Sequence, residues 1–294
     1  MANMISGSIT ALVTPFKDGK VDEQTFQDFV NWQIAQGTHG LVPCGTTGET
    51  STLTEREHSR VVAMCVEAAD GRVPVIAGIG SNSTEIAVKL AREAIAAGAD
   101  YGLSVTPYYN KPGQEGMYQH FKAVADQTGI KQVIYNIPGR SIVDLSAETM
   151  GRLAAIPTVV GVKDASSMID RVMAYKDTCG DDFIQLSGDD PTALGHAAHG
   201  GNGCISVASN VAPDKLAAFH NACQAGEFGK ARAMQTKLDA LFKDLFVEAS
   251  PAPTKYALSL LGKMTPEVRL PVMECTPAAK KAVEAAMVRA GITH

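Results

Sequence analysis

The chain of 294 residues has no long apolar run, no basic cluster and no CxxC cysteine pair. The missing apolar run excludes a membrane span, and the first residues, MANMI, lack the basic and apolar regions of an export signal. A formal net charge of −5 argues against nucleic acid as the main partner. The six cysteines are scattered, so we expect reduced thiols in a cytoplasmic protein.

Short apolar runs alternate with amphipathic segments along the first 226 residues. Eight such units in about 225 residues are typical of a (β/α)8 TIM barrel. An open doubly wound sheet is the alternative, but residues 78–83 lack the third glycine of its phosphate turn. The expected strands are 8–15, 40–43, 73–79, 100–106, 132–137, 159–163, 183–187 and 204–208. The expected helices are 24–36, 54–69, one between Ser83 and Gly98 with Ile86, Leu90, Ala94 and Ile95 on one face, 115–128, 146–155, 168–178, 190–199 and 213–225.

The strand pattern stops after Gly226, where only helical segments are expected, at 230–247, 253–261 and 277–290. We therefore divide the chain into a catalytic barrel, residues 1–226, and a C-terminal helical region, residues 227–294. That region is too short for a second α/β domain. Its predicted task is assembly of an oligomer.

Lys163 ends the apolar run 159–163, which reads as a strand buried on both faces. In a barrel, the carboxyl ends of the strands form the active site. A lysine there is either solvated at the rim or held in a pocket, where burial disfavours the ammonium and frees the amine for attack on a carbonyl. A solvated position is commoner for an isolated lysine. The residues at the other strand ends favour a lysine held in a pocket.

Three further strand ends carry groups that suit a carbonyl substrate. The turn Gly45-Thr46-Thr47-Gly48 offers hydroxyls and approachable backbone N–H groups to a carboxylate, although it also fits an ordinary capped turn. Tyr135 is a candidate proton shuttle or a buried, satisfied tyrosine. Arg140 has a planar fork suited to a carboxylate or to a surface ion pair.

The remaining polar residues do not suggest a metal site or a cofactor. Asp189 and Asp190 lack the companion ligands that a metal needs, and Asp190-Pro191 fits a helix start. His196 and His199 share a helical face without a third ligand, and we interpret them as structural.

With these motifs the chain resembles the 4-hydroxy-tetrahydrodipicolinate synthase (dihydrodipicolinate synthase) family, within the pyruvate-dependent class I aldolase superfamily. The resemblance covers essentially the whole chain. Tandem tyrosines and an arginine directly after Pro-Gly favour the synthase over the superfamily's lyases. The motifs are GTTGE at 45–49, TPYYN at 106–110, YNIPGR at 135–140, VKD at 162–164 and GCISV at 203–207.

The resemblance implies a reaction without a cofactor, in the diaminopimelate route to lysine. Lys163 forms a Schiff base with pyruvate, whose enamine adds to L-aspartate-4-semialdehyde. It also implies a homotetramer built as a dimer of dimers. The implied roles are catalysis by Lys163, a proton relay of Thr46, Tyr135 and Tyr109, with Tyr109 reaching the neighbouring subunit, and substrate binding by Thr47, Arg140, Gly188 and Ile205.

The family also implies a candidate site for L-lysine as a feedback inhibitor. The family's ammonium-binding glutamate aligns with Ile86, while Glu85 lies one position earlier, about 100° around a helix. Feedback inhibition is therefore left open. The matching positions are Thr50, Ser51, His58, Asn82 and Tyr108.

Two other functions compete with the synthase. One is an N-acetylneuraminate lyase or a 2-keto-3-deoxy sugar acid aldolase, which uses the same enamine chemistry. The other is a non-catalytic carboxylate sensor that keeps the fold. The combination of Thr46, Tyr135, Arg140 and Lys163 argues against a sensor, because a sensor has no need of a proton shuttle beside an amine.

Overall fold

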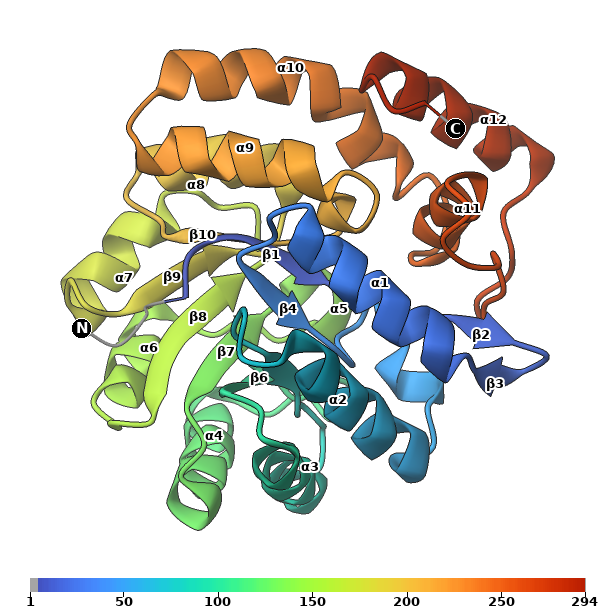
Figure 1. Ribbon diagram of the computed structural model, residues 1–294. Helices are drawn as coiled ribbons and strands as arrows, with labels where there is room; N and C mark the ends of the chain where they lie inside the picture. Colours follow the sequence, from blue (N-terminus) through green and yellow to red (C-terminus); the bar gives the residue numbers. More distant parts are fainter. Residues whose placement is uncertain (1–4, 294) are drawn as a thin grey trace.

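The computed structural model describes residues 5–293 and contains an eight-stranded parallel sheet that curves into a barrel (Figure 1). An isolated bridge between Leu41 and Val75 joins its two end strands. The predicted (β/α)8 barrel is confirmed. The pairing order is β4 (Gly40–Val42), β1 (Gly7–Ala11), β10 (Gly203–Ser206), β9 (Ile184–Ser187), β8 (Val159–Asp164), β7 (Gln132–Asn136), β6 (Tyr101–Val105) and β5 (Ile76–Gly78).

Helices alternate with the strands and form the outer layer of the barrel (Figure 1). Their ends follow local chemistry: Thr54 and Ser83 accept hydrogen bonds from backbone N–H groups at helix starts, and Gly98 ends a helix at a φ of 89°. The outer helices are α1 (Glu23–Ala35), α2 (Glu55–Ala69), α3 (Thr84–Ala97), α4 (Gln114–Thr128), α6 (Ala147–Ala154), α7 (Arg171–Cys179), α8 (Ala193–Ala198) and α9 (Pro213–Gln224).

Several short elements were not expected from the sequence. They span too few residues to show a helical or strand period. They are the hairpin β2 (Phe16–Lys17) and β3 (Lys20–Val21), the short helix α5 (Pro138–Ser141), and the 3₁₀ turns η1 (Thr50–Thr52) and η3 (Ala208–Asn210). The predicted helix 190–199 begins as the 3₁₀ turn η2 (Asp190–Thr192) before α8.

The predicted buried face of α3 was partly wrong: Ala94 is buried and Leu90 packs partly buried against the core, but the two isoleucines do not. Ile86 is 46% exposed and Ile95 is 44% exposed, so neither lies against the barrel. The helix instead buries its small residues and Val88, because alanines allow the close approach to the neighbouring helices. The buried residues of α3 are Ala87, Val88, Ala91 and Ala94.

The C-terminal helices α10 (Phe228–Asp244), α11 (Ala252–Leu260) and α12 (Pro277–Arg289) lie outside the barrel, as predicted (Figure 1). Helix α10 packs on α9 and α12, and α11 packs on α12. Between residues 5 and 293, no helix combines the length and the apolar character that a membrane crossing requires.

Candidate active site

Lys163 lies near the end of β8 and is only 7% exposed. The register of β7 and β8 pairs it with Tyr135, and its Nζ lies 4.0 Å from the centre of the Tyr135 ring. No carboxylate among residues 5–293 forms an ion pair with this amine. The strand end therefore presents a buried amine, unpaired within the described residues, where a Schiff-base lysine is expected.

Gly188 follows β9 and lies against the side chain of Lys163. A Cβ at this position would lie 2.9 Å from Cε of Lys163 and 2.8 Å from Cβ of Ala165. Only glycine therefore leaves room for the present path of the Lys163 side chain. This contact supports the expected place of Gly188 beside the amine.

The turn after β4 presents the two threonines differently, since Thr46 is exposed and Thr47 is buried. The Gly48 N–H donates to the Gly45 carbonyl, and the Gly48 carbonyl accepts a hydrogen bond from the Thr14 hydroxyl at 2.8 Å. Within the described chain, the backbone N–H groups of Thr46 and Thr47 have no protein acceptor. The turn thus offers two N–H groups and a hydroxyl to an anion.

A cavity of about 210 Å³ opens beside this turn at the carboxyl ends of the strands. Its size suits a small molecule better than a polymer. Arg140, on α5, is exposed and lines the cavity together with Thr46, which agrees with a carboxylate-binding role. The lining residues are Thr46, Thr50, Ser51, Gly80, Val105, Tyr108, Ile137, Arg140 and Ser141.

Tyr109 does not enter this cavity. It is 89% exposed and has a φ of 73°, a left-handed backbone that is uncommon for a bulky residue. The Asn110 side chain fixes the loop by donating to the Asn82 carbonyl at 2.8 Å. An aromatic side chain held outward in this way fits the expectation that Tyr109 acts on a neighbouring subunit.

Ile205 lies in β10 and is 1% exposed. It belongs to the cluster of apolar side chains inside the barrel, together with Tyr135 and Leu186. Its side chain is therefore part of the packed interior of the barrel, while its expected pocket-lining backbone role stays a prediction.

The five candidate lysine-binding residues do not form one separate site within the chain. Thr50, Ser51 and Tyr108 line the same cavity as Thr46. His58 is buried in α2, where burial lowers its pKa, and Asn82 is half-buried in the loop before α3.

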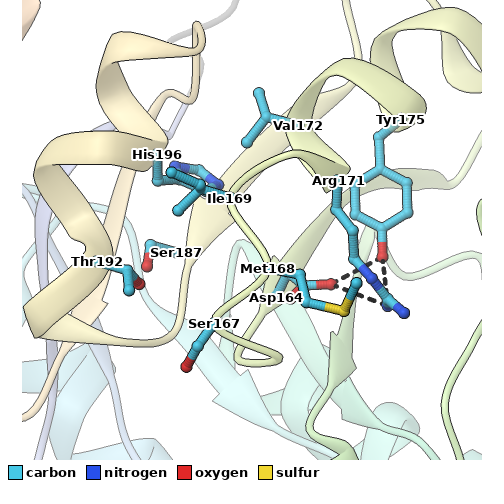
Figure 2. Close-up of a pocket in the computed structure, with 10 residues that line it drawn as sticks. All are labelled: Asp164, Ser167, Met168, Ile169, Arg171, Val172, Tyr175, Ser187, Thr192 and His196. Atoms are coloured by element: carbon cyan, nitrogen blue, oxygen red, sulfur yellow. Dashed lines mark hydrogen bonds and ion pairs between the residues drawn. The ribbon is translucent and has the colours of Figure 1, made fainter.

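A charged network directly after Lys163 was missed by the sequence analysis. Figure 2 shows Arg171 and Tyr175 of α7 directed at Asp164, with a Tyr175 hydroxyl to Asp164 distance of 2.8 Å. Arg171 also binds Asp144, with 2.7 Å between Nη1 and Oδ1. Burial and the Asp164 charge raise the pKa of Tyr175. The signal was the acidic residue that ends an otherwise apolar strand.

The cavity beside this network measures about 10 Å³, which is room for about one water molecule. Figure 2 places His196, Thr192 and Ser187 on its other side. It is too small for an organic substrate. The network is therefore a support behind β8 rather than a second substrate site.

The acidic pair after β9 begins a helical turn at Asp190-Pro191, as predicted. Asp189 is the cap, since its carboxylate accepts the Thr192 N–H at 3.2 Å. Asp190 is buried and accepts N–H groups of Val207 and Ala208, both at 3.0 Å. Among residues 5–293, no group of three or more His, Cys, Asp or Glu side chains has the arrangement of a metal site.

The comparisons with known proteins agree with this geometry. Residues 4–290 match the dihydrodipicolinate synthetase family. The chain belongs to this family. It is 57% identical to the 4-hydroxy-tetrahydrodipicolinate synthase of Methylobacterium radiotolerans, over 98% of this chain and 96% of that protein. The predicted family and the predicted Schiff-base enzyme of the class I aldolase type are confirmed.

Two solved structures of family members have nearly the same fold as this chain. The chloride-inhibited dihydrodipicolinate synthase of Acinetobacter baumannii, complexed with pyruvate, has a TM-score of 0.96 at 42% identity, covering 99% of this chain and 100% of that one. The enzyme of Cyanidioschyzon merolae with lysine bound has a TM-score of 0.95 at 36% identity, covering 98% and 99%. Neither the sugar-acid lyase nor the sensor is supported by these relatives.

The contact between Gly188 and Lys163 predicts a sharp effect of Gly188→Ala. The new methyl group would displace the Lys163 side chain, so the rate of Schiff-base formation with pyruvate should fall about tenfold or more. Borohydride trapping followed by mass spectrometry measures this rate. Gly113→Ala is the control, because a Cβ there meets no atom within 4 Å. Equal rates in both variants would contradict the assigned contact.

Proposed function

We propose that the chain condenses pyruvate with L-aspartate-4-semialdehyde through a Schiff base on Lys163, as a 4-hydroxy-tetrahydrodipicolinate synthase. The carrying observation is a buried amine, 7% exposed and without an ion-pair partner in the described chain, at the carboxyl end of a barrel strand. The family supports the same reaction, because its members named above are synthases.

In the first step, Nζ of Lys163 attacks the keto carbon of pyruvate and forms a carbinolamine. Loss of water gives the protonated imine. The turn of Thr46 and Thr47 holds the pyruvate carboxylate with its two free N–H groups and the Thr46 hydroxyl. A carboxylate held there would orient the keto carbon for attack by the amine, and such orientation lowers the barrier of a bimolecular step.

In the second step, the imine loses a proton from its methyl carbon and becomes an enamine. The methyl carbon then attacks the aldehyde of the second substrate, and the new alkoxide takes up a proton. Tyr135 lies beside Lys163 in the strand register and is the group placed to move protons at these atoms. The substrate's amino group finally displaces Lys163 from the imine carbon and closes the ring.

Arg140 has the place and the charge to bind the carboxylate of the second substrate. It lines the cavity with Thr46, so the two substrates meet between the turn after β4 and helix α5. The relay then continues through Tyr109 of a neighbouring subunit. Because Tyr109 points out of its own subunit, we propose a dimer as the smallest complete unit and a dimer of dimers as the assembly, with α10–α12 contributing to it.

The central test is borohydride reduction in the presence of pyruvate, followed by mapping of the modified peptide. The imine accepts hydride and becomes a stable secondary amine, so Lys163 should carry the adduct and Lys163→Ala should carry none. Circular dichroism controls for folding of the variant. The product assay uses coupling to the downstream reductase.

Three results would contradict this function. An adduct on another lysine would remove Lys163 from the mechanism. Faster pyruvate release from N-acetylneuraminate or a 2-keto-3-deoxy acid than cyclic product formation would favour the lyase. Absence of any adduct in the wild-type protein would favour the sensor.

The trans role of Tyr109 predicts complementation between two defective chains. Tyr109→Phe should lower kcat while still allowing the pyruvate adduct, and Lys163→Ala should be inactive. In a mixed assembly, a subunit with intact Lys163 receives Tyr109 from its partner. Co-assembled chains should therefore exceed the summed activity of the two separate variants. No gain on mixing would place Tyr109 outside the shared site.

Feedback inhibition by L-lysine stays a proposal, supported by the lysine-bound family member from Cyanidioschyzon merolae. Both Glu85 and Ile86 are exposed in α3, so Glu85 is available to an ammonium despite the shift of one position. We expect L-lysine to lower the initial rate and Glu85→Gln to weaken that inhibition. D-lysine is the control ligand. Unchanged inhibition in the variant would assign the ammonium to another group.

A further inference from the structure

The turn that carries Thr46 and Thr47 ends on Glu49, a side chain that is 4% exposed. Its Oε1 accepts a hydrogen bond from Nζ of Lys255 at 2.5 Å, and its Oε2 accepts the backbone N–H of Arg269 at 3.0 Å. These partners lie 206 and 220 residues further along the chain, in the C-terminal region. The substrate-binding turn is thus fastened to residues outside the barrel repeat.

Lys255 is fully buried in α11. Its Nζ also donates to the Glu267 carbonyl at 2.7 Å and lies 4.0 Å from the centre of the Phe16 ring. An ion pair removed from water in this way is often no more stabilising than an apolar pair of the same size. A gain in folding stability is therefore a weak explanation for the Lys255–Glu49 ion pair. A role in fixing the conformation of the turn explains it better.

Glu49 connects this ion pair directly to Thr46. The Glu49 N–H donates to the Thr46 carbonyl at 3.1 Å, and the Glu49 carbonyl accepts the Thr52 N–H at 3.0 Å. The backbone of Glu49 is left-handed, with a φ of 56°, which a non-glycine residue keeps only when its surroundings hold it. If the carboxylate moved, the strained backbone would relax and Thr46 would move with it.

We infer that Lys255 is a positioning residue for pyruvate binding: through Glu49 it holds the turn of Thr46 and Thr47 in the shape that receives the pyruvate carboxylate. This inference rests on the proposed function, in which that turn binds pyruvate. Lys255 touches no substrate. Its effect should therefore appear in pyruvate binding and not in the binding of the second substrate, whose carboxylate is assigned to Arg140.

The test compares Glu49→Gln and Lys255→Met with a matched control, Glu57→Gln. Glu57 also joins the barrel to the C-terminal region, through Arg269 at 2.6 Å, but it lies on α2 beyond the turn. We expect the KM for pyruvate to rise about tenfold or more in Glu49→Gln and in Lys255→Met, since small misplacements of binding groups have effects of this size. The KM for aspartate semialdehyde, measured at saturating pyruvate, should stay near the wild-type value.

The control should lose thermal stability and keep its KM for pyruvate. Glu49→Gln retains an acceptor of the same size for the Arg269 N–H, so it carries the test if Lys255→Met does not fold. Equal increases of both KM values, or equal KM values for pyruvate in Glu49→Gln and Glu57→Gln, would overturn the inference.

Borohydride trapping of the wild-type protein separates the two proposals. If the wild type forms no adduct with pyruvate on Lys163, the proposed function fails and the positioning role fails with it. If the wild type forms the adduct, and Glu49→Gln and Lys255→Met keep the wild-type KM for pyruvate, only the positioning role is wrong.

Discussion

Lys163 is buried at the end of β8, yet no carboxylate of the described chain pairs with it, and the rest of the site is arranged around this amine. Lys255 shows the opposite solution. It is buried more completely, and Glu49 supplies its counter-ion. One chain therefore holds two buried lysines in different surroundings: Lys255 is paired with a carboxylate, whereas Lys163 lies against the Tyr135 ring with no carboxylate partner among the described residues.

The barrel provides what an unpaired amine requires. Parallel pairing of β7 and β8 puts the Tyr135 ring against Nζ, and the missing side chain of Gly188 leaves space for the stem. Behind the strand, Asp164 keeps its charge satisfied by Tyr175, so this carboxylate is turned away from the amine beside it in the sequence. The neighbours of Lys163 thus hold its side chain in place without forming an ion pair with its amine.

Much of this arrangement was predictable from the sequence, and the misses have physical reasons. The eight strands follow from local patterns, so the positions of Lys163, Tyr135 and Arg140 at or just after strand ends could be predicted. Ile86 was misplaced because α3 buries alanines, which an apolar pattern weighs too little. The contact of Glu49 with Lys255 spans 206 residues, and no local pattern reports a pairing at that distance.

The barrel closes between β4 and β5, where an isolated bridge joins Leu41 to Val75 and the Leu41 N–H donates to the Pro74 carbonyl at 3.0 Å. The chain passes from this joint straight into the turn of Thr46, where the Gly78 N–H donates to the Pro43 carbonyl and a Cβ at Gly78 would lie 2.0 Å from the Cys44 carbonyl oxygen. A shift of β4 against β5 would therefore move the start of the turn that carries Thr46. Lys255, buried in α11, is bound to Glu49 at the other end of the same turn, so this turn is tied both to the barrel and to the C-terminal region.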